Sequence, residues 1–298
     1  MFSYRHAFHA GNHADVLKHV TLMALLRHLT QKDTALTVID THAGAGLYRL
    51  DEGQAATSGE AQGGIARLWG AQGLCPPLDD YVSLVRAFNA EAAAGAGTST
   101  GGKGEHALRL YPGSPLIVQR LLRPQDKLHL FELHSTDVPL LERNVQHLHA
   151  GRQVQVHASD GFAATKALLP PPSRRGLVLI DPSYEIKTDY ARTAAAVADG
   201  LERFATGTYA VWVPQLARLD AQHLPDKLKR MAERAGRPWL HAALAVRAPG
   251  GVHSGLHASS MLVINPPYTL RATLRRALMQ LHELLAQDTH ASYAISSQ

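Results

Sequence analysis

The chain has 298 residues with 30 Lys or Arg, 25 Asp or Glu and 18 His, so its formal net charge is +5 at pH 7. This charge favours an anionic partner, while a hydrophobic content of 45% excludes an intrinsically disordered chain. The single cysteine, Cys75, excludes an internal disulfide and a cysteine metal cluster, and the sequence shows neither a signal peptide nor a membrane-spanning apolar run. We therefore expect a cytoplasmic protein with no membrane partner.

Short segments rich in Val, Ile and Leu alternate along the chain with segments of helical periodicity. This alternation predicts an α/β fold with a mostly parallel sheet and helices on both faces. In such sheets, ligands bind beyond the carboxyl ends of the strands. Seven strands are predicted, at 35–40, 127–133, 153–158, 177–181, 208–214, 240–246 and 261–265.

The connection between the first two predicted strands is far longer than one crossover helix requires. We expect a single domain over 1–298 with a small helical insertion at 53–109, in which 64–72 and 78–91 form helices. The run of Ala, Gly, Ser and Thr at 92–103 predicts a flexible surface loop.

Three strand ends in succession carry residues suited to an adenosyl cofactor. The first strand runs into Asp40-Thr-His-Ala-Gly-Ala-Gly46, whose glycines allow a ligand to approach the backbone closely. Glu132, after the second strand, could accept hydrogen bonds from ribose hydroxyls. Asp160, after the third, could accept from an adenine amino group, with Phe162 packed on the ring. Each acid could instead cap the next helix, but their order along the chain favours the cofactor.

The fourth strand ends in Leu179-Ile-Asp-Pro-Ser-Tyr184. Methylation of an exocyclic amine requires acceptors for both of its N–H bonds, so that the nitrogen stays aimed at the methyl donor and its proton can leave. Asp181 and the backbone carbonyl of Pro182 suit these roles, and Tyr184 could stack on the base. The alternative is an ordinary Asp-Pro turn with a packed aromatic residue.

Two further segments invite a chemical interpretation. Val263-Ile-Asn-Pro-Pro-Tyr268 looks like the same amine-methylation motif, but it follows the seventh strand, so we interpret it as structural. The histidines between Tyr4 and His19 match no metal-binding spacing, and we predict no metal site. A helix that begins near Asn12 would bring Asp15, Lys18 and His19 within reach of a cofactor or a phosphate; the alternative is a solvated amphipathic helix. Ser114 is predicted to cap another helix, with Pro115 as its first residue.

Together these motifs resemble the bacterial large-subunit ribosomal RNA methyltransferase J family, whose members are S-adenosylmethionine (AdoMet)-dependent 23S rRNA (adenine-N6)-methyltransferases. The resemblance extends over nearly the whole chain and is most specific in the motifs Tyr4 to His19, Asp40 to Gly46, Tyr111-Pro-Gly-Ser-Pro115, Ser173-Arg-Arg-Gly176 and Lys187-Thr-Asp-Tyr190. It implies a Rossmann-like class I AdoMet-dependent methyltransferase fold, with a seven-stranded sheet and a helical insertion between strands 1 and 2.

The resemblance also implies roles for individual residues. Asp181 would be the catalytic acceptor, and Tyr4 would contact the RNA, where we also expect His6 and Lys18. Ser183 replaces a proline of the family motif, but the carbonyl of Pro182 is retained, so activity is expected. The residues expected to contact AdoMet are His19, His42, Gly44, Gly46, Ser114, Glu132, Asp160, Gly161 and Phe162.

We therefore predict methyl transfer from AdoMet to N6 of one adenine in 23S rRNA by a monomeric enzyme. The target base would be extruded from its stack, and basic residues would hold the phosphates. A DNA adenine-N6 methyltransferase and a non-catalytic RNA-binding module on a methyltransferase fold are the alternatives, with a histidine-metal hydrolase least favoured. The candidate phosphate contacts are Arg5, Lys18, Arg174, Arg175 and Lys187.

Overall fold

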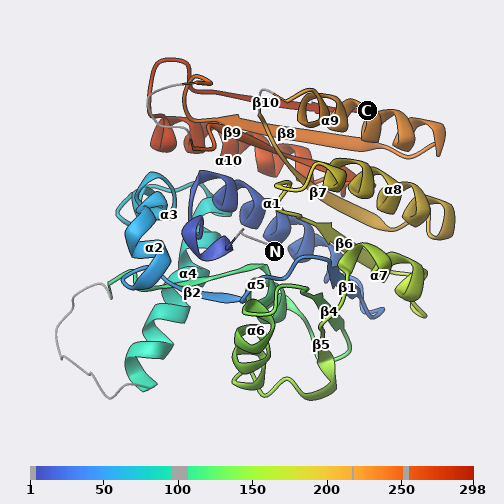
Figure 1. The fold of residues 1–298 in the computed structure, drawn as a ribbon, viewed down its shortest axis with the longest axis horizontal. Coiled ribbons are helices and arrows are strands. Elements are labelled where there is room, and N and C mark those ends of the chain that lie inside the picture. The colour runs from blue at the N-terminus through green and yellow to red at the C-terminus, as the bar shows by residue number, and fades with distance from the viewer. Residues whose placement is uncertain (1–4, 96–106, 217, 251–254) are drawn as a thin grey trace.

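The computed structural model describes residues 5–95, 107–216, 218–250 and 255–298. An eight-stranded sheet in the order β10-β8-β9-β7-β6-β1-β4-β5 forms the centre of the molecule (Figure 1). Its strands are β1 (Thr37–Asp40), β4 (Lys127–Phe131), β5 (Val154–His157), β6 (Gly176–Ile180), β7 (Thr208–Pro214), β8 (Trp239–Ala245), β9 (Ala258–Ile264) and β10 (Ser292–Ser297).

Five of these strands form a parallel half of the sheet. β5, β4, β1, β6 and β7 pair in parallel, whereas β9 pairs antiparallel with β7 and β8, and β10 pairs antiparallel with β8. In chain order the parallel strands run 3-2-1-4-5, which is the doubly wound arrangement with its switch point between β1 and β6. This is the Rossmann-like α/β fold expected of a class I methyltransferase.

The prediction of seven strands was incomplete. All seven predicted segments are strands, but the sheet also contains β10, and a separate hairpin pairs β2 (Leu47–Arg49) with β3 (Leu110–Pro112). β10 lies at the sheet edge and its residues are mostly exposed, so it lacks the apolar signal of a buried strand. The hairpin strands have only three residues each, too few to show a period.

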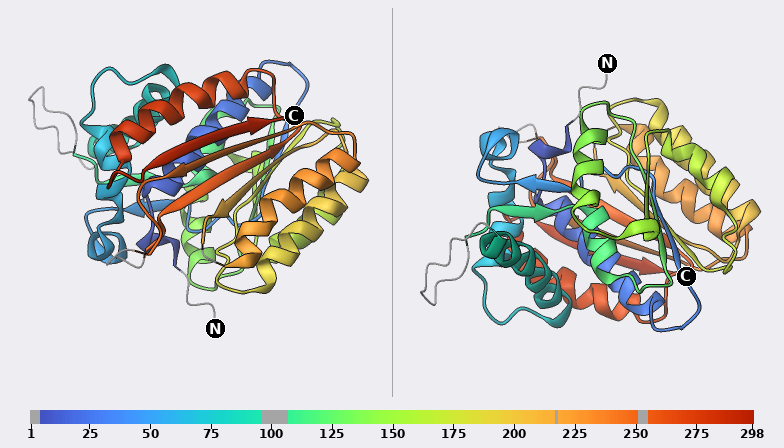
Figure 2. Two further views of the ribbon diagram at one scale, coloured as in Figure 1. Left: turned by 90° about the horizontal axis from the view of Figure 1, so that it is seen from above. Right: turned by 90° about the horizontal axis from the view of Figure 1, so that it is seen from below.

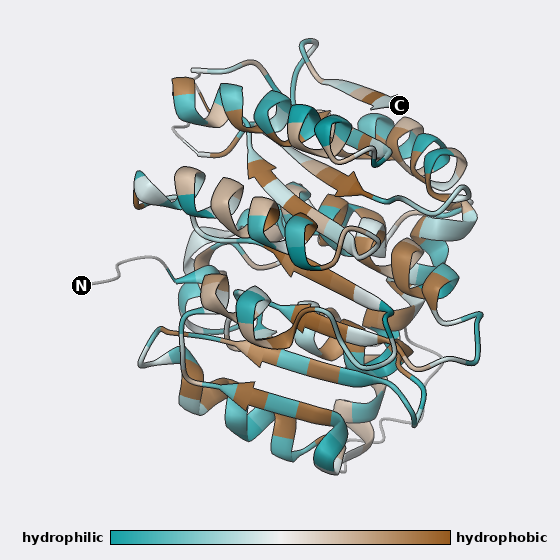
Figure 3. Ribbon diagram, turned by 90° about the vertical axis from the view of Figure 1, so that its right-hand side faces the viewer, coloured by the Kyte–Doolittle hydropathy of each residue, from teal (hydrophilic) through white to brown (hydrophobic). Residues whose placement is uncertain are grey.

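Helices cover both faces of the sheet because each face is apolar (Figures 2 and 3). Alternate strand residues face opposite sides: Val38 and Leu179 pack in one core cluster, and Ile39 and Ile180 pack in the other. One face carries α1 (His13–Leu29), α5 (Ser114–Leu121), α6 (Asp137–Gln146) and α10 (Leu270–Leu285), and the other carries α7 (Gly161–Leu168), α8 (Thr188–Arg203) and α9 (Leu219–Arg234).

The helix predicted to begin near Asn12 is buried along most of its length. Asn12 caps α1, since its side chain accepts hydrogen bonds from the backbone N–H groups of Ala14 and Asp15 at 2.9 and 3.0 Å. The helix then packs against α4, α5, α10 and β9. The alternative of a solvated amphipathic helix is therefore wrong.

As far as the structure describes it, the predicted insertion contains three short helices and one long helix. Between β2 and β3 lie α2 (Gly53–Ser58), η2 (Glu60–Gly63), α3 (Ile65–Trp69) and α4 (Pro76–Gly95). The helix expected at 64–72 is thus shorter, and that at 78–91 longer, reaching Gly95 within the predicted loop 92–103; residues 96–103 lie outside the described residues. Short 3-10 helices are η1 (His6–Phe8) and η3 (Gly151–Gln153). Within the described part of the chain, no helix is long and apolar enough to cross a membrane.

Candidate active site

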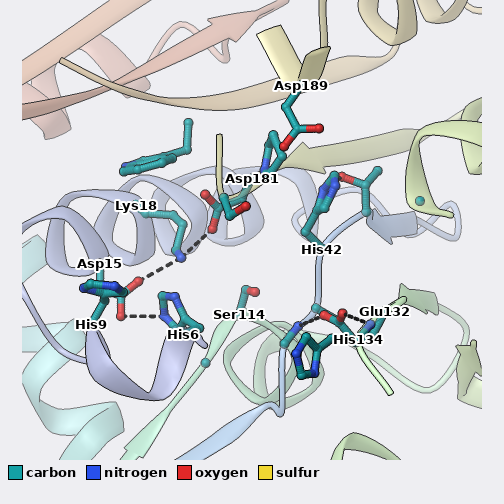
Figure 4. A pocket seen from close by; sticks show the side chains of 18 of the residues that line it. His6, His9, Asp15, Lys18, His42, Ser114, Glu132, His134, Asp181 and Asp189 are labelled. Atoms are coloured by element: carbon teal, nitrogen blue, oxygen red, sulfur yellow. Dashed lines mark hydrogen bonds and ion pairs between the residues drawn. The ribbon is translucent and has the colours of Figure 1, made fainter. Parts of the chain in front are cut away.

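A cavity of about 280 Å³ opens where the parallel strands end (Figure 4). It has two halves, which we name by their origin. The loop half comes from the segments after β1, β4 and β5 and from the start of α5, and it contains His42, Gly44, Ser114, Glu132, Asp160 and Phe162. The α1 half comes from α1, the segment before it and the ends of β6 and β7, and it contains His6, Asp15, Lys18, Asp181, Pro182 and Trp212.

Asp40 lies buried behind the lining of the loop half, next to Ser114 and His42. Its carboxylate accepts hydrogen bonds from the Ser114 hydroxyl at 2.7 Å and from the His42 backbone N–H at 3.3 Å. Burial raises the pKa of Asp40 to about 6. The prediction that Ser114 caps α5 was wrong: Ser114 is the first residue of the helix, Gly113 precedes it, and the hydroxyl of Ser114 binds Asp40 instead.

The two glycines after β1 have different surroundings. Gly44 lines the cavity with φ +61°, and a side chain there would collide with the Tyr48 hydroxyl at 2.4 Å. Gly46, with φ +80°, instead faces Leu116 and Leu141, and its carbonyl accepts a hydrogen bond from Gly113 at 2.8 Å. Gly46 does not line the cavity, so the prediction that it contacts the cofactor is corrected: it shapes the turn.

Glu132 is held in the cavity wall by backbone donors. One carboxylate oxygen accepts from the Gly44 N–H at 2.7 Å, and the other accepts from Leu133 at 2.8 Å and His134 at 2.7 Å. The bond from Gly44 joins the segment after β1 to the segment after β4, and the other two lie within the turn that follows Glu132. They fix an acceptor at the end of the second parallel strand, as the sequence predicted.

Asp160 has the helix-capping role that the sequence allowed, and it also lies in the cavity, where its contact with the cofactor stays a prediction. It caps α7, because it accepts a hydrogen bond from the Phe162 N–H at 3.0 Å, and it also lines the cavity. Its second oxygen forms an ion pair with Arg192, a residue of α8. The Arg192 guanidinium lies 4.4 Å from the centre of the Phe162 ring, a cation–π distance. Sequence analysis missed Arg192, because no motif marks it.

Two other predicted cofactor contacts are fixed by close packing around β1. Gly161 lines the cavity, and a Cβ atom there would lie 1.8 Å from the Thr41 carbonyl oxygen, so only glycine fits. His42 packs edge-on against Phe162, with ring centres 4.7 Å apart. Burial lowers the pKa of His42 to about 3, so its imidazole is neutral at physiological pH.

His19 lines the cavity and has one buried nitrogen without a partner in the described part of the chain. Its Nδ1 lies 2.8 Å from the Tyr111 hydroxyl, while its buried Nε2 has no hydrogen-bond partner among the described residues. Burial lowers the pKa of His19 to about 3, which keeps the ring neutral. An unpaired buried nitrogen is costly unless a ligand meets it, so this arrangement fits a polar group in the cavity.

A chain of charges runs through the α1 half (Figure 4). The Lys18 Nζ lies 2.6 Å from Asp181 Oδ2 and 2.8 Å from Asp15 Oδ1, and Asp15 Oδ2 lies 3.0 Å from His6 Nε2. Lys18 is only 4% exposed. A contact of Lys18 with an RNA phosphate is therefore not expected, because two carboxylates inside the protein engage its ammonium group. Lys18 lines the cavity, so its contact with the substrate stays a prediction.

The pKa values of these groups follow from burial and pairing. Burial opposes the charge on Lys18, but Asp15 and Asp181 outweigh it and hold the pKa of Lys18 well above its usual value. Burial likewise opposes the charge on Asp15, but His6 and Lys18 hold its pKa well below the usual value. For Asp181 burial prevails over Lys18, and its pKa is raised. Asp181 thus binds a proton more readily than an exposed carboxylate.

The motif after β6 differs from its prediction at one residue. Pro182 lies in the cavity beside Asp181, as expected, and Ser183 also lines it. Tyr184, however, has φ +55° and is 2% exposed; its ring packs on Tyr190 with centres 4.6 Å apart. Its hydroxyl donates a hydrogen bond to the Trp212 carbonyl at 2.8 Å. The expected stacking of Tyr184 on a base is therefore corrected, since the ring lies outside the cavity lining.

The remaining predictions concern residues around and beyond the cavity. His6 lines the cavity, whereas Tyr4 lies outside the described residues. Arg5 lies at the rim, 3.3 Å from Asp137, and Lys187 is exposed beside the start of α8. Arg174 and Arg175 precede β6, so they lie at the opposite end of the sheet, and their prediction as phosphate contacts at this site was wrong.

The second methylation-like motif is structural, as predicted. β9 runs antiparallel to β7, which carries Asn265 away from the cavity. The Asn265 amide donates hydrogen bonds to the carbonyls of Ala205 and Gly207, and it ties this turn to the start of β7.

Among the residues that the structure describes, no group of three or more His, Cys, Asp and Glu could hold a metal ion.

Comparisons with known proteins agree with this geometry. The family model described as Ribosomal RNA large subunit methyltransferase D, RlmJ, matches residues 33–296. Ribosomal RNA large subunit methyltransferase J of Escherichia coli (strain K12) is 44% identical over 289 residues, which cover 96% of this chain and 94% of that protein. The protein of the same name from Haemophilus influenzae (strain ATCC 51907 / DSM 11121 / KW20 / Rd) is 42% identical over 295 residues, covering 99% and 98%.

A solved structure shares the fold over almost the entire length. Protein LPL1258 from Legionella pneumophila str. Philadelphia 1 superposes with a TM-score of 0.83 at 32% identity, covering 97% of this chain and 98% of that one. The match of the family model and the identity to both methyltransferases cover far more than half of the chain. The chain therefore belongs to the RlmJ family of ribosomal RNA large subunit methyltransferases.

Proposed function

We propose that this protein transfers the methyl group of AdoMet to N6 of an adenine in 23S ribosomal RNA. The names of its relatives support a ribosomal RNA substrate. The observation that carries the adenine assignment is that Asp181 and the adjacent Pro182, after β6, lie in the same cavity as the loop half. The Asp181 carboxylate and the Pro182 backbone carbonyl are two acceptors, and an exocyclic amine has two N–H bonds to donate.

The loop half fits AdoMet by the chemistry of its groups. Glu132 would accept hydrogen bonds from the ribose hydroxyls, and Asp160 from the adenine amino group, with Phe162 against the ring. The buried Nε2 of His19, unpaired among the described residues, would provide one further polar contact, and Gly44 offers a close approach to the backbone. When bound, AdoMet supplies an activated methyl group. Arg192 would then share Asp160 with the adenine.

The α1 half supplies the proton chemistry. The Asp181 carboxylate and the Pro182 carbonyl would accept the two N–H bonds of N6, which holds the nitrogen lone pair toward the methyl group. As the new N–C bond forms, positive charge develops on N6, and Asp181 stabilises it and accepts the proton. Lys18 holds this carboxylate in place at 2.6 Å. Burial raises the pKa of Asp181, which favours acceptance of the proton.

Methyl-labelled AdoMet and 23S rRNA from cells that lack this activity provide the test. We expect label in the RNA, and the modified nucleoside should be N6-methyladenosine at one mapped position. Duplex DNA serves as the competing substrate, and a preference for DNA would replace this proposal with a DNA adenine methyltransferase. Absence of any heat of AdoMet binding in calorimetry would instead indicate a non-catalytic RNA-binding module.

A further inference from the structure

The cavity wall beyond Asp181 has a different character from the loop half. It consists of apolar side chains from the end of β7 and the segments that follow β7 and precede β9: Trp212, Pro214, Leu216 and Leu256. None of these residues belongs to the motifs that the sequence analysis singled out. An apolar wall with one large aromatic residue suits a flat heterocycle better than it suits a charged group.

The strand register places Trp212 beside Asp181. β6 and β7 are parallel, and Ile180 pairs with Val211, so the next residues along the two strands are Asp181 and Trp212. Side chains alternate along a strand, and Leu179 and Ala210 both pack in the core cluster on the α1 face. Asp181 and Trp212, two residues further on, therefore point to this same face, where Lys18 lies.

Tyr184 supports Trp212 from outside the cavity. The two ring centres lie 6.0 Å apart at an interplanar angle of 42°, and the Tyr184 hydroxyl binds the Trp212 carbonyl. Trp212 itself is half-buried and lines the cavity. Within the described ranges no hydrogen bond engages its indole N–H. The side chain thus keeps an accessible surface at the cavity, and its N–H is left without a partner among the described residues.

We propose that Trp212 is the platform on which the target adenine stacks, and that Tyr184 holds this platform in place. This inference rests on the proposed function, because it assigns the base-binding wall of the same site. Base stacking on an aromatic side chain contributes roughly 1–3 kcal/mol per base, which helps to offset the cost of extruding the base. Because Trp212 lies next to Asp181, a base stacked there has its edge near the proton acceptor.

The kinetic test compares Trp212→Ala with Trp212→Phe. Loss of the stacked base should lower kcat/KM for 23S rRNA by roughly 5- to 150-fold in Trp212→Ala, mainly through KM, while Trp212→Phe keeps most of the activity. AdoMet affinity, measured by calorimetry, should not change in either variant, which also shows that they fold. The matched control is Trp239→Phe, because Trp239 lies at the start of β8, outside the cavity lining.

Tryptophan fluorescence tests whether an adenine base contacts Trp212 in the absence of methyl transfer. The chain has three tryptophans, so Trp69→Phe with Trp239→Phe leaves Trp212 as the reporter, and Trp69→Phe with Trp212→Phe leaves Trp239. Titration with adenosine monophosphate should quench Trp212 emission saturably and leave Trp239 emission unchanged. Unchanged Trp212 emission, or an unchanged kcat/KM for 23S rRNA in Trp212→Ala, would contradict the proposal that the base stacks on Trp212. Absence of methyl transfer by the natural protein would instead overturn the proposed function, so the two failures are distinguishable.

Discussion

The two halves of the cavity are held together in different ways. In the loop half, Glu132 is fixed by backbone N–H groups at 2.7–2.8 Å, and two of its three donors follow it directly in the chain. In the α1 half, Lys18 meets Asp181, which is 163 residues away in the chain, and both side chains are largely buried. Glu132 in the loop half thus depends mainly on its own turn, whereas Lys18 and Asp181 in the α1 half depend on distant charges that need one another.

This difference predicts how far a substitution propagates. When the hydrogen-bond partners of a side chain belong to its own turn, removal of that side chain requires only exposed or backbone groups to rearrange. Removal of one member of a buried charge chain leaves the others uncompensated, which costs far more than the contact itself provides. We therefore expect the α1 half to be the more sensitive in both activity and stability, and four experiments test this contrast.

The largest effect is expected from Asp181→Asn. The amide cannot accept the proton from N6, so kcat should fall by about 10²- to 10⁴-fold, the usual contribution of a positioned base. Calorimetry should give an unchanged affinity for AdoMet, because the loop half is intact. Near-normal turnover would contradict the role of Asp181, and lost AdoMet binding would make it a cofactor residue.

Lys18→Met tests the charge chain as a stabilising element. The substitution leaves Asp15 and Asp181 buried without their cation, and it should lower the free energy of unfolding by about 3–5 kcal/mol. Urea denaturation measures this loss. In a double-mutant cycle, Lys18→Met with Asp15→Asn should cost less than the sum of the two single changes, because one uncompensated carboxylate is removed. Additive effects would show that the two residues act independently.

Much of the loop half could be predicted from the sequence, because its residues follow strands. An acid after a buried apolar run lies at the sheet edge whatever else the fold does, so Glu132 and Asp160 were placed correctly. Ser114 was predicted to cap its helix, but its hydroxyl binds Asp40 rather than the helix backbone. Such a choice between local and distant partners depends on tertiary packing.

The α1 half could be predicted only in part. Asp15 and Lys18 are three residues apart on a helix, so their proximity was foreseen, but their burial against Asp181 depends on how α1 packs onto the sheet. The left-handed backbone of Tyr184 turns its ring away from the cavity, and no sequence pattern signals that change. Trp212 lies inside β7, and an aromatic residue within a strand is ordinarily interpreted as part of the hydrophobic core.

Asp40→Asn tests how the buried carboxyl behind the loop half affects the pH dependence of stability. The carboxyl has a pKa of 3.8 in the unfolded chain and about 6 in the folded protein. Between these values the folded state binds the proton more tightly, so this group makes stability fall as pH rises, and the loss is complete above about pH 6. Asp40→Asn removes that contribution.

The free energy of unfolding of Asp40→Asn, relative to the natural protein, should therefore increase between pH 4 and pH 7 by on the order of 3 kcal/mol. Urea denaturation at several pH values measures this difference. Ser114→Ala is the matched comparison, because loss of its hydrogen bond raises the pKa of Asp40 further and moves the transition to higher pH. A difference that does not vary with pH would show that Asp40 is ionised as in water.

Glu132→Gln should have the smallest effect, and it isolates the loop half from the chemistry. Glutamine retains one acceptor oxygen for the backbone donors but lacks the charge that strengthens hydrogen bonds from ribose hydroxyls. The Kd for AdoMet should rise roughly tenfold, or about 1.4 kcal/mol, while kcat at saturating AdoMet stays near normal. Glu91→Gln, which alters a surface ion pair with Arg120 outside the cavity lining, is the control. Because the effect is confined to binding, a matching fall in kcat would show that the two halves are coupled and that the local turns of the loop half help to position Asp181.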